Sequence, residues 1–87
     1  MSESPPTVAI AGAAGRMGRK LVELGHAMDS VRLVCAFEAP DHPLLGQDVG
    51  ALAGIGPIGL ALASDAGLKD SAFDILIDFT TVDASLA

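Results

Sequence analysis

The chain contains four short apolar runs, and each predicts a β-strand. They cover Thr7 to Ala11, Arg32 to Phe37, Ile58 to Leu62 and Asp74 to Phe79. The first, second and fourth runs are almost continuously apolar rather than alternating, which is typical of strands covered on both faces in a parallel sheet. The pattern therefore predicts a parallel sheet rather than a chain of hairpins.

An amphipathic helix is predicted between the first two strands, beginning near Arg16 and ending before Asp29 and Ser30. Four apolar residues recur at helical spacing and should face the core: Met17, Leu21, Leu24 and Met28. Three charged residues on the same segment should point outward: Arg19, Lys20 and Glu23. A strand, a helix and a second strand in this order predict a right-handed β-α-β unit.

The segment 39–57 is rich in proline and glycine and is predicted to be a loop that carries one short helix near Gln47 to Ala53. Residues 64–69 are predicted to form a single helical turn. The fold class predicted is α/β, a Rossmann-like parallel sheet that is only part of a full domain, with strand order 3-2-1-4.

A glycine-rich turn follows the first strand without a break. Its residues are Gly12, Ala13, Ala14, Gly15, Arg16, Met17 and Gly18. A strand that ends in closely spaced glycines and opens a helix can place the pyrophosphate of a dinucleotide on the free N–H groups of that helix. The alternative is a purely structural tight turn. The spacing is Gly-x-x-Gly-x-x-Gly, which differs from the commonest Gly-x-Gly-x-x-Gly pattern.

Glu38 and Arg16 are further candidates for nucleotide binding. Glu38 ends the second apolar run, where a carboxylate can accept hydrogen bonds from ribose hydroxyls; the alternative is a solvated loop acid. Arg16 is disfavoured at the positive end of a helix unless a phosphate lies nearby; the alternative is a surface role. Met17 fits equally a core residue or a neighbour of the cofactor. Because Ala39 offers no charge for a 2′-phosphate, we expect NADH to be accepted at least as well as NADPH.

Composition narrows the function classes. Five Lys plus Arg against eleven Asp plus Glu give a net charge of −6, which argues against nucleic acid or an anionic membrane as a partner. No apolar run is long enough to span a membrane and no leader pattern is visible, so a cytoplasmic protein is expected. The single cysteine, Cys35, is expected to be a buried packing residue.

Other polar residues that could carry chemistry have a structural or surface interpretation. Asp74 and Asp78 flank the fourth run and are expected to cap strand ends rather than to act as an acid–base pair. His26 and His42 are expected to be surface residues, because neither has a partner at metal-ligand spacing. No metal site is predicted.

The residues at the two ends of the chain indicate the expected domain bounds. Residues 1–6 are predicted to be a flexible N-terminus, and residues 7–87 part of a dinucleotide-binding domain. Thr80 and Asp83 have the spacing of a capping box and predict the start of a helix near the last residue, Ala87. Because one helical turn is not stable alone, the chain is expected to be a piece of a longer protein.

Three segments together resemble one family, the dihydrodipicolinate reductases. The glycine turn from Gly12 to Arg19 resembles the opening signature of the family. The run Ile77-Asp78-Phe79-Thr80 resembles the end of its fourth strand, and Leu44 to Asp48 with Gly50 resembles its glycine-rich loop. The chain aligns with the amino-terminal third of the family.

The resemblance implies reduction of a cyclic dicarboxylate imine by NADH or NADPH in the diaminopimelate and lysine pathway, by a homo-tetramer. It implies that residues 12–17 hold the pyrophosphate, Glu38 the adenosine ribose, and Phe79 and Thr80 the nicotinamide half. The catalytic and substrate-binding residues of the family are expected beyond residue 87. Two departures are Ala39, where many members carry Arg, and Thr81-Val82-Asp83 in place of a proline-containing turn.

Two other functions fit the same residues. One is another two-domain NAD(P) dehydrogenase with a similar turn. The other is a non-catalytic Rossmann domain that senses NAD(H) and controls a partner.

Overall fold

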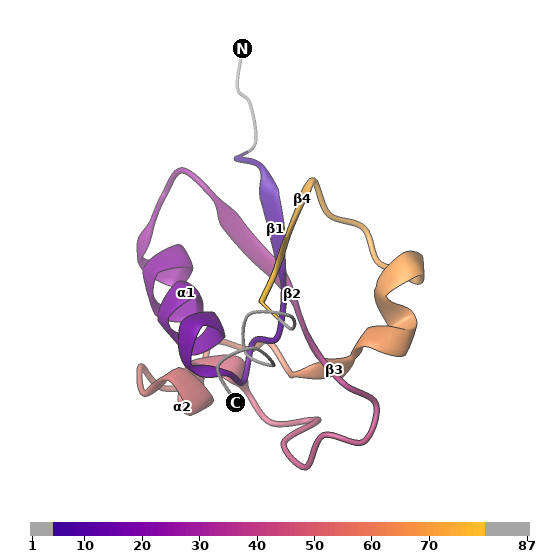
Figure 1. The fold of residues 1–87 in the computed structure, drawn as a ribbon. Coiled ribbons are helices and arrows are strands. Elements are labelled where there is room, and N and C mark those ends of the chain that lie inside the picture. The colour runs from indigo at the N-terminus through magenta and orange to yellow at the C-terminus, as the bar shows by residue number, and fades with distance from the viewer. Residues whose placement is uncertain (1–4, 80–87) are drawn as a thin grey trace.

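The computed structural model describes residues 5–79, which form a parallel sheet with helices on both faces (Figure 1). The elements in chain order are β1 (Thr7–Ala11), α1 (Arg16–Ala27), β2 (Arg32–Glu38), α2 (Val49–Ala53), β3 (Ala63–Ser64), the 3₁₀ helix η1 (Asp65–Asp70) and β4 (Ile75–Asp78). No helix among these residues is long and apolar enough to cross a membrane.

The sheet has the strand order β3-β2-β1-β4, and all three of its strand pairs are parallel. This confirms the predicted order and the Rossmann-like α/β class. β1 lies in the centre, between β2 and β4, and four of its five residues are buried. The first residues after β1 therefore emerge in the middle of the carboxyl edge of the sheet.

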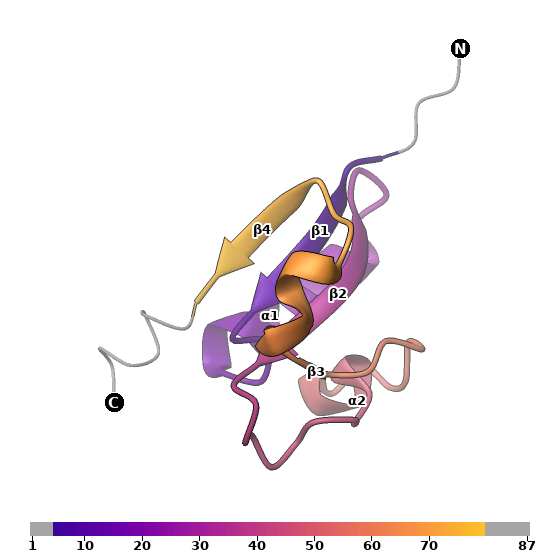
Figure 2. The same cartoon turned by 90° about the vertical axis from the view of Figure 1, so that its right-hand side faces the viewer.

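Each face of the sheet has its own core. α1 and α2 cover one face and η1 lies over the other, as two views at right angles show (Figures 1 and 2). Val8 and Ile10 of β1 point to the α1 side, whereas Ala9 and Ala11 point to the η1 side. β1 is thus covered on both faces, as its continuous apolar run predicts.

A β-bulge in β2 changes which face of the sheet its residues cover. Val8 pairs with Leu33 but Ala9 pairs with Cys35, so Val34 is skipped in the register. Leu33 packs with the α1-side core, and Cys35 and Phe37 pack with the η1-side core. Cys35 is a packing residue as predicted, although it is half-buried rather than buried.

The predicted third strand, Ile58 to Leu62, is wrong in position. The strand that pairs with β2 is only Ala63–Ser64, while Ala61 forms an isolated antiparallel bridge with Asp48. The physical reason is the carboxylate of Asp48. It accepts hydrogen bonds from the backbone N–H groups of Ile58 (2.9 Å), Gly59 (2.7 Å) and Leu60 (3.2 Å), which ties this segment to the start of α2.

Asp48 also caps α2, because its Oδ1 accepts from the N–H groups of Gly50 and Ala51 at 2.8 and 3.2 Å. Hydrogen bonds to the charged form, chiefly the one from the N–H of Ile58, hold the pKa of Asp48 below its ordinary value of 3.8. The predicted helix near Gln47 to Ala53 is therefore present as α2, starting two residues later.

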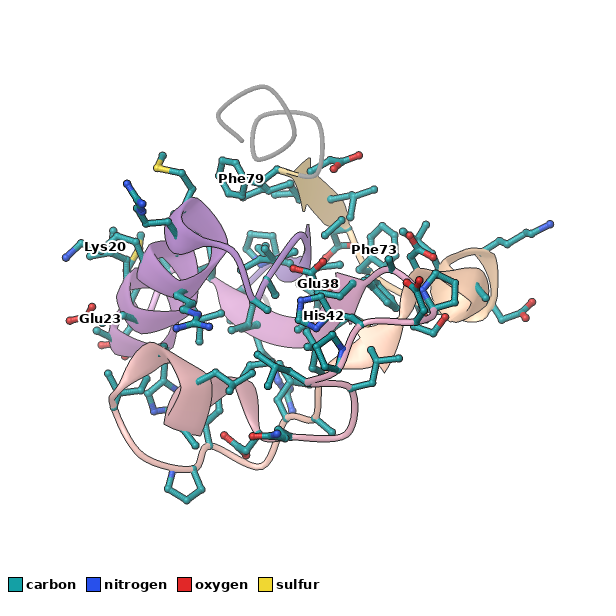
Figure 3. All side chains as sticks on the ribbon, turned by 60° about the horizontal axis from the view of Figure 1, so that its bottom comes forward. Lys20, Glu23, Glu38, His42, Phe73 and Phe79 are labelled. Atoms are coloured by element: carbon teal, nitrogen blue, oxygen red, sulfur yellow. The ribbon has the colours of Figure 1, made fainter. Side chains whose placement is uncertain are left out.

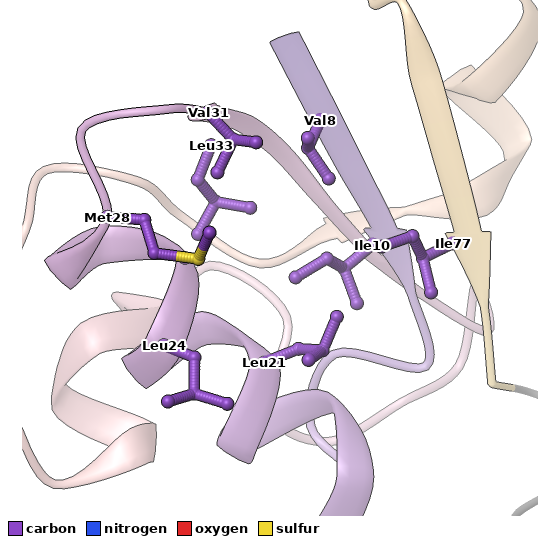
Figure 4. Close-up of a pocket in the computed structure, with 9 residues that line it drawn as sticks. Val8, Ile10, Leu21, Leu24, Met28, Val31, Leu33 and Ile77 are labelled. Carbon is purple, nitrogen blue, oxygen red and sulfur yellow. The ribbon is translucent and has the colours of Figure 1, made fainter. Parts of the chain in front are cut away.

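The apolar stripe of α1 is less buried than its spacing predicts. Met17, Leu24 and Met28 are between 46% and 48% exposed, and the buried residues of α1 are Gly18 and Val22. Leu24 and Met28 border an apolar hollow between α1 and the sheet (Figure 4), whose volume is about 250 Å³. The hollow lies between Leu21, Leu24 and Met28 on the helix and β1, β2 and β4 beneath.

The start of β4 is fixed to the start of β1 by side chains. The N–H of Thr7 donates to Oδ2 of Asp74 (2.8 Å), and the N–H of Asp74 donates back to Oγ1 of Thr7 (2.8 Å). This confirms Asp74 as a strand-end cap.

Parts of both chain ends lie outside the described residues. They are residues 1–4 of the expected flexible N-terminus, and Thr80 with the helix start predicted from Thr80 and Asp83. Of the first six residues, Pro5 and Pro6 are described, and the carbonyl of Pro6 accepts a hydrogen bond from the N–H of Arg32 at 2.9 Å.

Candidate functional site

The carboxyl ends of β1, β2 and β4 meet at one edge of the sheet, and most of the predicted site residues lie there. The N–H groups of Gly12 and Ala13 both donate to the carbonyl of Phe37, at 2.8 and 3.2 Å. The N–H of Phe79 donates to the carbonyl of Ala11 at 2.9 Å. The glycine turn, the end of β2 and Phe79 are thereby held side by side, although they are far apart in the sequence.

Two glycines of the turn, Gly12 and Gly18, are required by its geometry. Gly12 has φ 80°, in the left-handed region that residues with a Cβ rarely adopt. At Gly18 a Cβ would overlap the carbonyl oxygen of Gly12 and lie 2.7 Å from Cα of Ala13. The absence of a side chain at residue 18 lets α1 begin directly against the turn.

The first turn of α1 presents backbone donors toward this edge. Gly15 is the N-cap, no side chain of the described residues caps the helix there, and its first turn holds no acidic residue. The first hydrogen bond of the helix runs from the N–H of Arg19 to the carbonyl of the N-cap residue Gly15 at 2.9 Å. The N–H groups of Arg16, Met17 and Gly18 precede it, and together with the helix dipole they favour an anion.

Glu38 reaches this turn from the end of β2. Its Oε2 accepts a hydrogen bond from the N–H of Ala14 at 3.0 Å, and the side chain is half-buried. Figure 3 shows the labelled Glu38 at the end of β2, well apart from the exposed pair Lys20 and Glu23 on α1. The predicted acid at the strand end is therefore part of the same site as the glycine turn.

Arg19 makes a contact with the glycine turn that the sequence pattern does not predict. Helical periodicity puts it on the outer face of α1, and the residue is exposed, yet its Nε donates to the carbonyl of Ala14 at 2.7 Å. The only sequence signal for this contact is the place of Arg19 directly after Gly18, because a long side chain there can reach back over the first turn.

Almost the whole chain matches one known protein family. The family model described as "Dihydrodipicolinate reductase, N-terminus" matches residues 6–87. The chain belongs to the dihydrodipicolinate reductase family. Its Rossmann-like fold is that of the amino-terminal part of the family.

One curated member of the dihydrodipicolinate reductase family is the 4-hydroxy-tetrahydrodipicolinate reductase of Methanocaldococcus jannaschii. It is 44% identical to this chain over 81 residues. The aligned region covers 88% of this chain and 30% of the relative. The chain therefore spans about a third of the length of the reductase that it matches.

The other predicted site residues of this dihydrodipicolinate reductase family member differ in how far they are buried. Arg16 and Met17 are exposed on the first turn of α1, so Met17 is not a core residue. Phe79 is half-buried and packs against the α1-side core. Thr80 lies outside the described residues.

The histidines and acids elsewhere form no second centre in the described part of this family member. His26 is exposed, and His42 is half-buried with its Nδ1 accepting from the N–H of Leu44 at 3.1 Å. Across residues 5–79, no group of three or more His, Cys, Asp or Glu side chains is placed to hold a metal ion.

Proposed function

We propose that the edge formed by the glycine turn, Glu38 and Phe79 binds NADH or NADPH, and that the intact protein is a reductase of 4-hydroxy-tetrahydrodipicolinate. The reaction would belong to diaminopimelate and lysine biosynthesis, in the cytoplasm. The dicarboxylate substrate and a homo-tetrameric assembly are part of the same proposal. The catalytic residues would come from the part of the protein beyond residue 87.

The observation that carries the proposal is the uncapped start of α1 beside the left-handed Gly12. The turn lies at the carboxyl edge of a parallel sheet, where β1 stands between β2 and β4, and Arg16 and Met17 at the start of α1 are exposed there. Dinucleotides bind at such points in open α/β sheets. The donor set, N–H groups and no carboxylate in the first turn, fits a pyrophosphate.

Each described residue would have a role in holding the cofactor. The N–H groups of Arg16, Met17 and Gly18 would bind phosphate oxygens, and the guanidinium of Arg16 would balance their charge. Glu38 would accept hydrogen bonds from the hydroxyls of the adenosine ribose. Phe79 would lie on the nicotinamide side. The bound cofactor supplies the hydride, and this part of the protein supplies position and electrostatics.

Glu38 followed by Ala39 supports the use of NADH at least as readily as NADPH. A carboxylate at the end of β2 repels a 2′-phosphate, and the exposed Ala39 beside it brings no compensating charge. Arg16 is the cation of the described site that could partly offset this repulsion.

Titration of the intact protein with NADH, followed by the fluorescence of the reduced nicotinamide, tests the proposal. We expect saturable binding that weakens about tenfold in Arg16→Ala, the loss of one charge-assisted contact. Lys20→Ala is the matched control, because Lys20 is an exposed cation of α1 that pairs with Glu23 and should leave binding unchanged. Absence of saturable binding by either nucleotide would overturn the proposal.

A further inference from the structure

The N–H of Ala14 is held differently from its neighbours in the glycine turn. The N–H groups of Gly12 and Ala13 donate to the carbonyl of Phe37, and that of Gly15 donates to the carbonyl of Gly12 at 3.1 Å. These bonds are all between backbone groups. The N–H of Ala14 instead donates to the side chain of Glu38, 24 residues later in the chain.

A second side chain, that of Arg19, hydrogen-bonds to the carbonyl group of Ala14. The carbonyl of Ala14 accepts from Nε of Arg19 at 2.7 Å, while its N–H donates to Oε2 of Glu38 at 3.0 Å. The side chain of Ala14 is buried, at 7% exposure, so the residue has little freedom to turn over. Two side chains of opposite charge therefore set the two peptide planes that flank Ala14.

We propose that Glu38 is a positioning residue for the glycine turn, in addition to the ribose contact proposed above. By accepting from Ala14, it sets the turn in the conformation that presents the N–H groups of α1 before any nucleotide is bound. The inference rests on the proposed nucleotide site, because it assigns a second task to one of its residues.

The two tasks are chemically compatible within one carboxylate. An ionised carboxylate has two oxygens and about four lone-pair positions for donors. One bond from Ala14 to Oε2 leaves Oε1 and further positions for ribose hydroxyls. Glu38 can thus bind the ribose without releasing the turn.

The binding test compares two neutral variants, Glu38→Gln and Glu38→Ala, so that the loss of negative charge is the same in both. The glutamine amide oxygen can still accept from Ala14, and the alanine has no acceptor. The probe is an NADH analogue that lacks both hydroxyls of the adenosine ribose. We expect the intact Gln variant to bind this probe about 3- to 10-fold more tightly than the Ala variant, the worth of one hydrogen bond.

Amide hydrogen exchange tests the same contact without any nucleotide. In the ligand-free protein, the N–H of Ala14 should exchange faster in Glu38→Ala than in Glu38→Gln, while the N–H of Ile10 in β1 should be unchanged. Glu23→Ala, which removes an exposed acid of α1, should leave Ala14 as in the parent protein. The exchange result stands even if neither nucleotide binds, so failure of the proposed function remains distinguishable.

Equal exchange of Ala14 in the Gln and Ala variants would overturn the inference. Equal affinity of the two variants for the analogue, with protection of Ala14 unaltered, would assign Glu38 to the ribose alone. Faster exchange in the Ala variant together with weaker binding of the analogue would establish the positioning role.

Discussion

Gly18 lies so close to Gly12 that a Cβ at residue 18 would overlap the carbonyl oxygen of Gly12. The overlap is with backbone, which cannot swing aside as a flexible side chain can. The close approach joins the start of α1 to the end of β1, so the position of the turn depends on it.

Gly18→Ala should lower the free energy of unfolding by about 1–3 kcal/mol, or more if the turn cannot shift, because the added methyl overpacks a buried contact. Urea denaturation followed by circular dichroism measures the change. Gly25→Ala is the matched control on the same helix, since a Cβ there meets nothing within 4 Å. The control should be neutral or stabilising by up to about 1 kcal/mol, and equal destabilisation by both changes would contradict the prediction.

Asp48 should contribute a pH-dependent part of the stability. Its pKa is lowered in the folded protein, chiefly by the hydrogen bond from Ile58, so its contribution is fully present above the ordinary value of 3.8. The contribution is lost as the pH falls through the lower pKa of the folded state. In Asp48→Asn this acid-side loss should disappear, and the variant should be less stable at neutral pH.

Thermal unfolding of the parent protein and of Asp48→Asn between pH 3 and pH 7 measures this difference. The melting temperatures of the two proteins should approach each other toward acid pH, because protonation removes the charge that the five backbone donors stabilise. A constant difference across the range would count against the assignment to Asp48.

Ala39→Arg should shift nucleotide preference toward NADPH. A guanidinium beside Glu38 would offset the repulsion of a 2′-phosphate and could bind it directly, so we expect NADPH to gain about tenfold relative to NADH. Dissociation constants of the intact protein for both nucleotides give the ratio. Ala39→Gln, of similar length without charge, should leave the ratio near that of the parent, and an equal shift in both variants would exclude the charge as the cause.

Thr7 and Asp74 should be energetically coupled. Thr7→Val and Asp74→Ala each remove part of the reciprocal hydrogen bonding between the starts of β1 and β4, at about 0.5–1.5 kcal/mol each. The double variant should lose less than the sum, with a coupling of about 0.5–1 kcal/mol from urea denaturation. The pair Thr7→Val with Glu23→Ala should be additive, since Glu23 lies on the outer face of α1. Additivity in the Thr7 and Asp74 pair would refute the coupling.

The candidate site was predictable in part because much of it is contiguous in sequence. Residues 12–17 form one turn between a strand and a helix, and their glycines signal the conformation locally. Glu38 was placed by the rule that parallel strands end at the same edge. Arg19 was missed, because its bond to Ala14 depends on a side chain folding back over the helix start, which periodicity does not describe.

The sequence by itself determined the bounds of β1, the parallel class of the sheet and the glycine turn that opens α1. These follow from apolar runs, helical spacing and glycine positions, all of which act over a few neighbouring residues, whereas the predicted strand order follows from the precedent of Rossmann-like sheets. Only the tertiary structure decided where the third strand lies, which face each residue of β2 covers after the bulge at Val34, and that Glu38 holds Ala14. Each of these depends on hydrogen bonds between segments distant in sequence, whose partners no local pattern specifies.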